Sequence, residues 1–479
     1  MSHQEPIFWD AVFHPKSVCV IGKTDSFKGG TMFINSLINS GYKGKISVVS
    51  TDNGGDHGFD SFDKIEDLPD GIDYAILAIA AIKTPEAIRK LGEKGAKVAH
   101  IFSSGFGDLE TEIGRTLEKD LKMAGIEGGV RIIGPNCLGV FSPESAITYP
   151  PGIYPKEIGN LGFISQSGGT AQSLAWSGDI YSFFHNKGVS LGNSVDLSIE
   201  DFLEYMVNDP KIEIISLYIE GVKDGARFLE LLQSATKTKP VVILKAGITE
   251  AGVVATASHT GTLAGNATVW NAAVRQAGGV IVSTFDELVE TVSAFTKRRG
   301  SPKKRIAIVN RGGGEGIVAA DTLPTIGLDV PPYTKKTQDA LSNLIPSAGT
   351  GMKNPLDFAA VGGYPGVFEK VLATIDDDES TDTIIYMHHI EYAHLFTRKE
   401  YNQYLLDTLV KFYEQSRKTL LVVLPLYYSF DEWIRSMMYL TSKGVSTHPT
   451  IYGAGKAALH LAEFEEYIET KSKKQDRSQ

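Results

Sequence analysis

Cysteine is nearly absent from this sequence of 479 residues, which contains only Cys19 and Cys137. Two thiols cannot build a disulfide framework, so a disulfide-rich scaffold is excluded and a reducing compartment is favoured. No uncharged apolar run reaches the ~20 residues that a membrane span requires, so we expect no membrane contact. The first thirty residues contain Glu5, Asp10 and Lys16 and lack the pattern of a signal peptide, which predicts a cytoplasmic protein.

Clustered positive charge is missing as well. The chain carries 57 acidic and 47 basic residues, which gives a net charge of −10. No stripe of lysine and arginine of useful length occurs before the C-terminal tail, so binding to nucleic acid through neutralised phosphates is not expected.

Glycine is the residue in excess, with 49 of the 479 positions. The usual share in globular proteins is roughly 7%. The glycines show no three-residue period, which excludes a collagen-like chain. Many of them stand just after apolar runs, where a chain turns at the end of a strand.

Short apolar runs alternate with amphipathic segments along the whole chain, as in parallel sheets covered by helices. Strands are expected at 17–22, 45–50, 73–80, 97–104, 130–136, 162–165, 212–221, 240–247, 280–283, 305–310, 382–389 and 419–428. The length suggests about three domains. We predict three doubly wound α/β units, at residues 1–150, 151–299 and 300–479.

Two stretches are expected to be irregular. Residues 248–265 have little apolar content and are rich in Thr, Ser, Ala and Gly, which indicates a loop. Residues 297–305, KRRGSPKKR, contain no apolar residue and are typical of a linker or an exposed connection.

Small polar residues follow several of the predicted strands, where the start of the next helix favours anions. The strongest case is Ser165, Gln166, Ser167, Gly168 and Gly169, which offer two hydroxyls, an amide and two glycines to a phosphate. The alternative is an N-cap with a tight turn. The signal is weaker at Gly22 and Thr24, where GxGxxG is absent, and at glycines 312–314, where a close-packed turn explains the residues equally well.

His259 lies in the sequence TASHTGTLAG, within the predicted loop. A histidine in a loop is ordinarily solvated, but an imidazole among small residues can also serve as nucleophile, base or metal ligand. No second His or Cys stands at a ligand spacing, so we predict no metal site. Glu220 follows a predicted strand, where a carboxylate could hold an imidazole N–H or could simply begin a turn.

Three other residues that could carry chemistry are interpreted as structural. Cys137 has an apolar neighbour and no nearby histidine, so a buried thiol is favoured over a nucleophile. His388 and His389 are adjacent in a predicted strand, so their side chains should point to opposite faces and not chelate jointly.

The motifs occur together in the order of one known family. They are HPKSVCVIG at 14–22, IGPNCLG at 133–139, GFISQSGG at 162–169, YIEG at 218–221 and SHTGTLAG at 258–265. On these residues the chain resembles the α subunit of ADP-forming acyl-CoA synthetases of the acetyl-CoA type, relatives of succinyl-CoA synthetase. The sequence VNRGGGEGIVAADTLPTIGLDV, with NPLDF at 354–358, is similar to that family's additional α domain.

The resemblance implies a CoA-binding Rossmann-like domain followed by two flavodoxin-like domains. It also implies a reaction in which acyl-CoA and phosphate give acyl phosphate and CoA, a histidine takes the phosphoryl group, and ADP then receives it as ATP. His259 would be the phosphorylated nucleophile and Glu220 the acid that orients it. The phosphoryl group would be held by Ser165, Gln166, Ser167, Gly168 and Gly169. CoA would be held by Gly22, Lys23, Thr24, Ser103, Ser104, Gly105 and Asn136.

The sequence departs from the family pattern in the CoA-binding part. The family's Gly-Ala-Ser after the first strand is here Gly22, Lys23 and Thr24, and its usual Asn-Pro after the second strand is Ser50 and Thr51. AIAAIK at 78–83 also lacks the family's proline. The CoA pocket is therefore expected to differ.

Neither a Walker A motif nor a segment resembling an ATP-grasp domain is recognisable in the sequence. The resemblance implies that a separate ATP-grasp β subunit supplies the ATP/ADP site and holds most of the Mg2+, in a hetero-oligomer such as α2β2. Two alternatives stay open: a CoA- or acyl-CoA-binding protein without ligase activity, and an acyl or carbamoyl transferase subunit on the same fold. The intact His259 and Glu220 favour the ligase.

Overall fold

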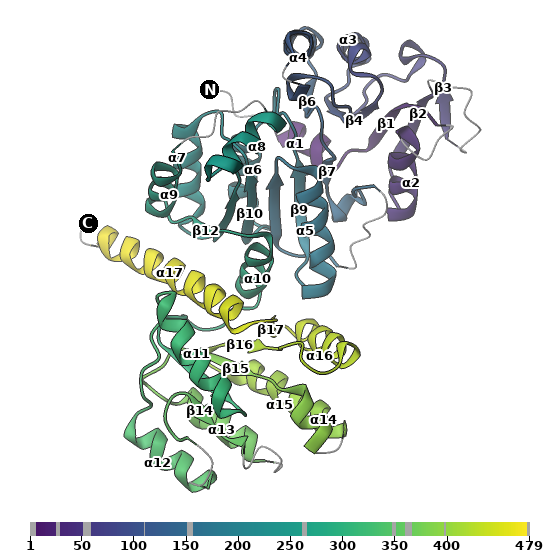
Figure 1. The fold of residues 1–479 in the computed structure, drawn as a ribbon. Helices are drawn as coiled ribbons and strands as arrows, with labels where there is room; N and C mark the ends of the chain where they lie inside the picture. The colour runs from purple at the N-terminus through teal and green to yellow at the C-terminus, as the bar shows by residue number, and fades with distance from the viewer. Residues whose placement is uncertain are drawn as a thin grey trace. The chain divides into compact units, whose positions relative to one another are not determined.

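The computed structural model describes residues 6–24, 29–50, 59–109, 111–150, 157–260, 266–346, 351–359, 366–396 and 399–476. They form an α/β protein with three sheets, as predicted (Figure 1). The chain divides into two compact units, Met1–Asp179 with Phe184–Ile281, and Ile180–Phe183 with Val282–Gln479. The first two sheets belong to unit 1, except for Val282 at the end of the last strand, and the third sheet belongs to unit 2. The predicted boundaries at 150 and 300 stay predictions.

The first sheet is entirely parallel and has the strand order β3-β2-β1-β4-β5-β6, which is the order of a Rossmann domain. Its strands are β1 (Ser17–Gly22), β2 (Lys45–Ser50), β3 (Asp60–Phe62), β4 (Tyr74–Ala78), β5 (Val98–Ile101) and β6 (Arg131–Ile133). The helices of this part are α1 (Pro6–Phe13), α2 (Gly30–Ser40), α3 (Thr84–Glu93) and α4 (Glu112–Gly128). Helix α2 ends at Gly41, whose φ of 81° is the left-handed conformation that glycine adopts without strain.

The second sheet has the order β12-β11-β10-β8-β9-β7. Apart from β7, which pairs antiparallel to β9, this is the flavodoxin order 2-1-3-4-5. Its strands are β7 (Gly139–Phe141), β8 (Leu161–Ser165), β9 (His185–Ser190), β10 (Ile214–Ile219), β11 (Val241–Lys245) and β12 (Val280–Val282). The helices are α5 (Gly168–Tyr181), α6 (Ile199–Asn208), α7 (Gly225–Ala235), α8 (Glu250–Thr260) and α9 (Ala267–Gln276).

Strand β9 has the sequence HNKGVS and is not recognisable from hydrophobicity, yet all six residues are buried. Lys187 Nζ forms an ion pair with Asp209 at 2.8 Å and donates to Asn186 Oδ1 at 2.8 Å. The ring of His185 packs edge-to-face on Phe163. Lys187 and Asn186 fit this buried strand because their polar side chains find partners inside the fold.

We predict that Asp209→Asn destabilises unit 1 by about 3–5 kcal/mol, because it leaves the Lys187 ammonium buried without a counter-charge. The measurement is urea unfolding of the full chain followed by fluorescence. Asp339→Asn is the matched control, since its partner Lys335 is exposed and exposed pairs contribute little. Equal unfolding curves for the two variants would contradict the prediction.

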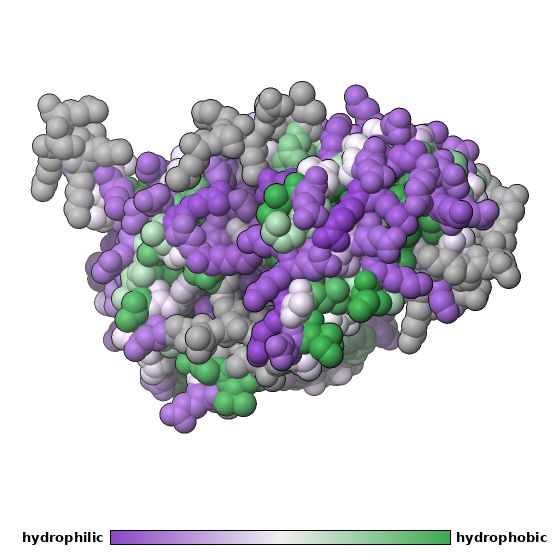
Figure 2. Space-filling model, turned by 90° about the horizontal axis from the view of Figure 1, so that it is seen from above, coloured by the Kyte–Doolittle hydropathy of each residue, from purple (hydrophilic) through white to green (hydrophobic). Residues whose placement is uncertain are grey.

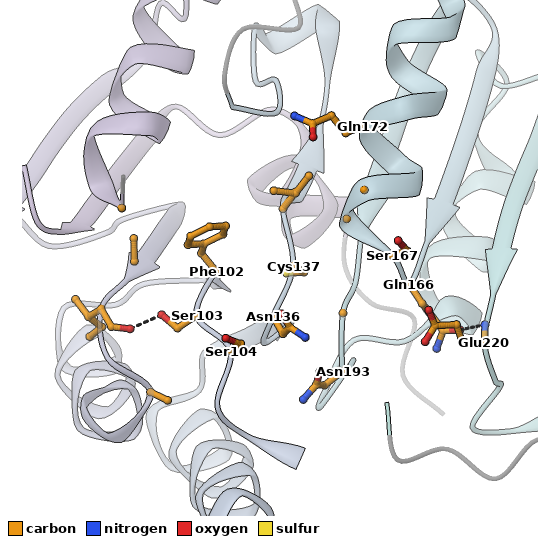
Figure 3. Close-up of a pocket in the computed structure, with 18 of the residues that line it drawn as sticks. Phe102, Ser103, Ser104, Asn136, Cys137, Gln166, Ser167, Gln172, Asn193 and Glu220 are labelled. Atoms are coloured by element: carbon orange, nitrogen blue, oxygen red, sulfur yellow. Dashed lines mark hydrogen bonds between the residues drawn. The ribbon is translucent and has the colours of Figure 1, made fainter. Parts of the chain in front are cut away.

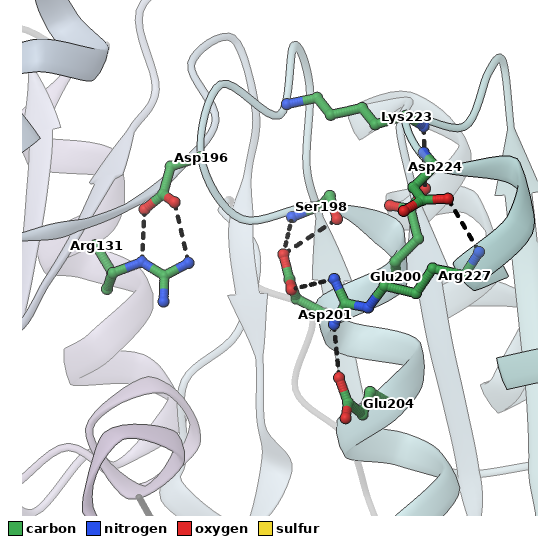
Figure 4. A network of polar contacts seen from close by, with 9 residues as sticks. All are labelled: Arg131, Asp196, Ser198, Glu200, Asp201, Glu204, Lys223, Asp224 and Arg227. Carbon is green, nitrogen blue, oxygen red and sulfur yellow. Dashed lines mark hydrogen bonds and ion pairs between the residues drawn. The ribbon is translucent and has the colours of Figure 1, made fainter. Parts of the chain in front are cut away.

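The two sheets of unit 1 are joined by an ion pair drawn in Figure 4. Arg131 at the start of β6 donates from Nε and Nη2 to the carboxylate of Asp196 at 2.8 and 3.0 Å. The backbone N–H of Ile132 donates to the same carboxylate at 2.9 Å. A bidentate guanidinium–carboxylate contact fixes orientation as well as distance. It therefore fixes the position of the first sheet relative to the segment that follows β9.

The third sheet is parallel and has the order β14-β13-β15-β16-β17, again the flavodoxin order. Its strands are β13 (Ile306–Asn310), β14 (Leu356–Asp357), β15 (Thr383–Met387), β16 (Thr419–Val423) and β17 (Ser446–His448). The helices of unit 2 are α10 (Phe285–Thr296), α11 (Gly313–Thr325), α12 (Lys335–Leu344), α13 (Val367–Asp376), α14 (Ile390–Phe396), α15 (Lys399–Gln415), α16 (Phe430–Ser442) and α17 (Ile451–Asp476).

Two expectations about irregular segments are corrected. The loop expected at 248–265 is wrong for Glu250–Thr260, which form α8. Alanines favour a helix here, and the Thr249 hydroxyl accepts the N–H of Gly252 at 3.1 Å, as an N-cap does. The exposed connection expected at 297–305 is wrong at Lys297, which is buried and donates to Tyr181 O and Ser293 Oγ. Burial lowers the pKa of Lys297 to about 7.

The face drawn in Figure 2 is mostly hydrophilic, with separate smaller hydrophobic areas among the polar side chains. Among the helices that the structure describes, none combines the length and the apolar character needed to cross a lipid bilayer.

Candidate active site

A cavity of about 860 Å³ lies in unit 1, at the carboxyl ends of strands from both of its sheets (Figure 3). Ligands of doubly wound sheets bind at this edge. The first sheet contributes residues 78–81 after β4, 102–104 after β5 and 136–138 after β6. The second contributes residues 166–169 after β8, Gly192 and Asn193 after β9, and Tyr218 and Glu220 on β10 and just after it.

Three residues expected to hold CoA line this cavity: Ser103, Ser104 and Asn136. The Ser103 hydroxyl donates to the carbonyl of Ile79, and the Ser103 carbonyl accepts the N–H of Asn136 at 3.0 Å. Asn136 has a φ of 61°, in the left-handed region that asparagine tolerates better than most residues. The turns after β4, β5 and β6 are thereby bonded to one another.

The other residues expected to hold CoA are not among the lining residues of the cavity. A side chain at Gly22 would place its Cβ 2.9 Å from the carbonyl oxygen of Ala78, so β1 and β4 end in close contact. Lys23 is exposed, and Thr24 is buried and shares a hydrogen bond of 2.9 Å with Ser50. Two of the positions that depart from the family pattern therefore contact each other. Gly105 turns with a φ of 110° and donates its N–H to Asp108.

The turn from β8 into α5 is built by serine side chains. The Ser165 hydroxyl donates to the carbonyl of Ser167 at 2.7 Å, and the Ser167 hydroxyl accepts the N–H of Thr170 at 3.2 Å. The N-cap considered as an alternative is therefore present. Gly168 and Gly169 begin the 14-residue helix α5 and line the cavity, so the positive end of its dipole lies at the cavity wall.

Glu220 follows directly after β10, is 8% exposed and lines the cavity. Tyr218 lies two residues earlier, on the same face of the chain, and also lines the cavity. Burial and the nearby Glu220 raise the pKa of Tyr218 to about 12. From β11, Lys245 Nζ donates to the Glu220 carbonyl at 2.8 Å. Burial lowers the pKa of Lys245 although the charge of Glu220 opposes this shift.

The side chain of His259 lies outside the described residues, and so do residues 261–265. The backbone at position 259 belongs to α8. The assignment of His259 as the reactive histidine therefore stays a prediction from the motif.

The interpretation of Cys137, His388 and His389 as structural stays a prediction, since Cys137 lines the cavity and the strand expected to contain both histidines ends at Met387. Cys137 is buried, and burial raises the pKa of its thiol to about 12. His388 and His389 follow β15 and are buried. His388 hydrogen-bonds to Asn402 at 2.8 Å and His389 to Asn310 at 2.9 Å. Within the described ranges, no group of three His, Cys, Asp or Glu residues is placed to hold a metal ion.

Tyr218 and Asn193 are among the lining residues that the sequence did not predict. Tyr218 lies two residues before Glu220, so the two side chains point to the same face of the sheet. That spacing could have predicted Tyr218 as a cavity residue. Asn193 donates from its amide to Asp108 at 3.1 Å and to Glu118 at 2.9 Å. It follows β9, and because the polar sequence of β9 gave no strand signal, nothing marked Asn193 as a strand-end residue.

Two protein-family models match the parts of the chain that form these two sheets. Residues 16–143 match the model of a CoA binding domain, and residues 158–295 match the model of a succinyl-CoA ligase like flavodoxin domain. By fold, the chain is similar to a dinucleotide-forming acetyl-coenzyme A synthetase 1 from Ca. Korarchaeum cryptofilum, solved with phosphate and ADP. The TM-score is 0.82 at 24% identity, over 96% of this chain and 98% of that one.

Two curated relatives are similar in sequence. The subunit alpha of acetate–CoA ligase (ADP-forming) II from Pyrococcus furiosus is 35% identical over 73% of this chain and 76% of its own length. An acetate–CoA ligase (ADP-forming) from Methanocaldococcus jannaschii is 34% identical over 72% of this chain but only 48% of its own length. The chain therefore belongs to the family of α subunits of ADP-forming acyl-CoA ligases, the acid–thiol ligases of the succinyl-CoA ligase superfamily.

Proposed function

We propose that this chain interconverts acyl-CoA, ADP and phosphate with a carboxylic acid, CoA and ATP, through an acyl phosphate and a phosphohistidine at His259. The observation that carries the proposal is a single cavity shared by two sets of predicted residues. Ser103, Ser104 and Asn136 line one side of it, and Glu220 lies on the other with residues 166–169. A CoA thioester and a phosphate would have to meet between such sets for the first step to occur.

The cavity is compatible in size and chemistry with these substrates. Its volume of about 860 Å³ lies in the range of small-molecule sites, which is roughly 300–1,000 Å³. The hydroxyls and amides of the first sheet can hydrogen-bond to the amides of a pantetheine arm. Phosphate would bind at the start of α5, where Gly168 and Gly169 let an anion approach the backbone N–H groups. Ser165 and Ser167 shape this turn.

In the proposed reaction, phosphate attacks the acyl carbonyl, the C–S bond breaks and CoA leaves as the thiol. The imidazole of His259 then attacks the phosphorus of the acyl phosphate, and the carboxylate leaves. Such transfers depend on positioning and charge stabilisation. Glu220 would accept the second N–H of the imidazole, which fixes the reactive tautomer.

The nucleotide half of the reaction is assigned to a partner. We propose that an ATP-grasp β subunit binds ADP or ATP with most of the Mg2+ in a hetero-oligomer, such as α2β2, in the cytoplasm. The match with the P. furiosus subunit alpha covers 76% of that protein. The match with the M. jannaschii ligase covers only 48% of that protein, so about half of the longer chain has no counterpart in the match. We propose that the partner corresponds to the additional half of that longer chain.

The test uses the full chain with an ATP-grasp chain that copurifies with it. Release of CoA is followed with a thiol reagent for acyl-CoAs of increasing chain length. We expect continued release to require acyl-CoA, phosphate, ADP and the partner together, whereas acyl-CoA and phosphate alone should release only about one CoA per chain. Binding of CoA without release from any acyl-CoA would instead support a CoA-binding protein without ligase activity.

A further inference from the structure

One side chain joins the carboxyl ends of β8 and β10. The Oε1 atom of Gln166 accepts the backbone N–H of Glu220 at 2.5 Å and that of Gly221 at 3.0 Å, and Figure 3 shows the first of these contacts. The backbone N–H of Gln166 donates to the carbonyl of Tyr218 at 3.2 Å. The bonds run in both directions, so the two segments are locked together.

The sheet itself explains why this side chain is needed. Strand β8 ends at Ser165, because the chain turns away into α5 at Gly168. Strand β10 reaches Ile219 and its chain continues into the cavity wall. Beyond the end of β8, the N–H groups of β10 need acceptors that β8 no longer supplies. An amide oxygen has two lone pairs, so Gln166 satisfies two successive N–H groups and extends the ladder.

The position of this contact is also significant. In the flavodoxin order, helices change face between β8 and β10, and ligands bind at that point. The segment after Glu220 is braced farther along as well, because Glu200 Oε1 accepts the N–H groups of Lys223 and Asp224 at 3.0 Å each (Figure 4). Gln166 is the brace that acts on the N–H of Glu220 itself.

We propose that Gln166 is a positioning residue of the ligase reaction, which fixes the backbone of Glu220 so that its carboxylate keeps one place in the cavity. This inference rests on the proposed function. The positioning role uses the amide oxygen of Gln166. The role of phosphate ligand that the family resemblance implies would use its amide NH2 group instead, and the KM for phosphate tests that role separately.

Gln166→Met tests the proposal, because methionine has a similar length and no strong acceptor. We expect kcat to fall by about tenfold to a hundredfold, the usual effect of a small misplacement, while KM for phosphate stays unchanged. Hydrogen exchange at the Glu220 and Gly221 amides should accelerate. Gln233→Met, on the exposed face of α7, is the matched control and should retain full kcat. Gln166→Glu keeps an acceptor oxygen and should retain more kcat than Gln166→Met.

The double variant Gln166→Met with Glu220→Gln separates positioning from a direct role. If Gln166 acts only through Glu220, the double variant has the same kcat as Glu220→Gln alone. Additive losses, an unchanged kcat in Gln166→Met, or a raised KM for phosphate at unchanged kcat would each overturn the proposal. Failure of the proposed function would be seen separately, as wild-type chain that never becomes phosphorylated.

Discussion

Replacement of His259 by alanine is expected to abolish turnover, with a loss in kcat on the order of 10⁴-fold or more, because the variant lacks the covalent carrier of the phosphoryl group. Binding of CoA should persist, since the cavity-lining residues proposed to hold CoA are Ser103, Ser104 and Asn136. The measurement combines steady-state synthesis of ATP with calorimetric titration of CoA into the variant.

His14→Ala is the matched control for this loss of an imidazole. His14 hydrogen-bonds to Ser145 at 2.8 Å and is not among the residues that line the cavity, so its variant should keep full activity. Measurable turnover by the His259 variant, at more than a trace of the wild-type rate, would mean that phosphoryl transfer does not pass through this histidine.

Replacement of Glu220 by glutamine is expected to lower kcat by about 10²- to 10⁴-fold, which is the usual range for loss of a catalytic or orienting carboxylate. Glutamine keeps the size of the side chain and a polar oxygen, so the fold should be unaffected. The lost element is the negative charge that favours one imidazole tautomer and steadies the imidazolium formed during transfer.

Phosphorylation of Glu220→Gln by acyl-CoA and phosphate, followed in a rapid-quench apparatus, measures this effect directly. We expect slow formation of the phosphoenzyme with an unchanged final level, because the carrier residue remains. Glu230→Gln on the exposed surface of α7 is the control and should react at the wild-type rate. A wild-type rate in Glu220→Gln would remove Glu220 from the proposed mechanism.

The regular alternation of apolar and amphipathic segments was sufficient to predict the fold class. A strand such as β1, SVCVIG, is apolar enough for its composition to indicate that it is buried, and its position was therefore predicted correctly. Strand β9, HNKGVS, was missed because its burial depends on tertiary partners, above all on Asp209 for Lys187. No local pattern records a partner that lies 22 residues away in the chain, as Asp209 does from Lys187.

Only part of the residues that line the candidate site was predictable, and their contacts were less so. The position of Glu220 at a strand end was sufficient to place it on the cavity rim. Gln166 was named together with its neighbours, but its contact with β10 depends on where β8 ends relative to β10. Likewise, Thr24 and Ser50 appeared as separate departures, and only the pairing of β1 with β2 brings their hydroxyls together.

Localisation of a phosphoryl group tests the central claim most directly. The full chain is incubated with acyl-CoA and inorganic phosphate, digested under alkaline conditions that preserve phosphohistidine, and sequenced by mass spectrometry. We predict one acid-labile, base-stable phosphoryl group on His259. A chain that stays unmodified while CoA is released, or a phosphoryl group on any other residue, would contradict the account.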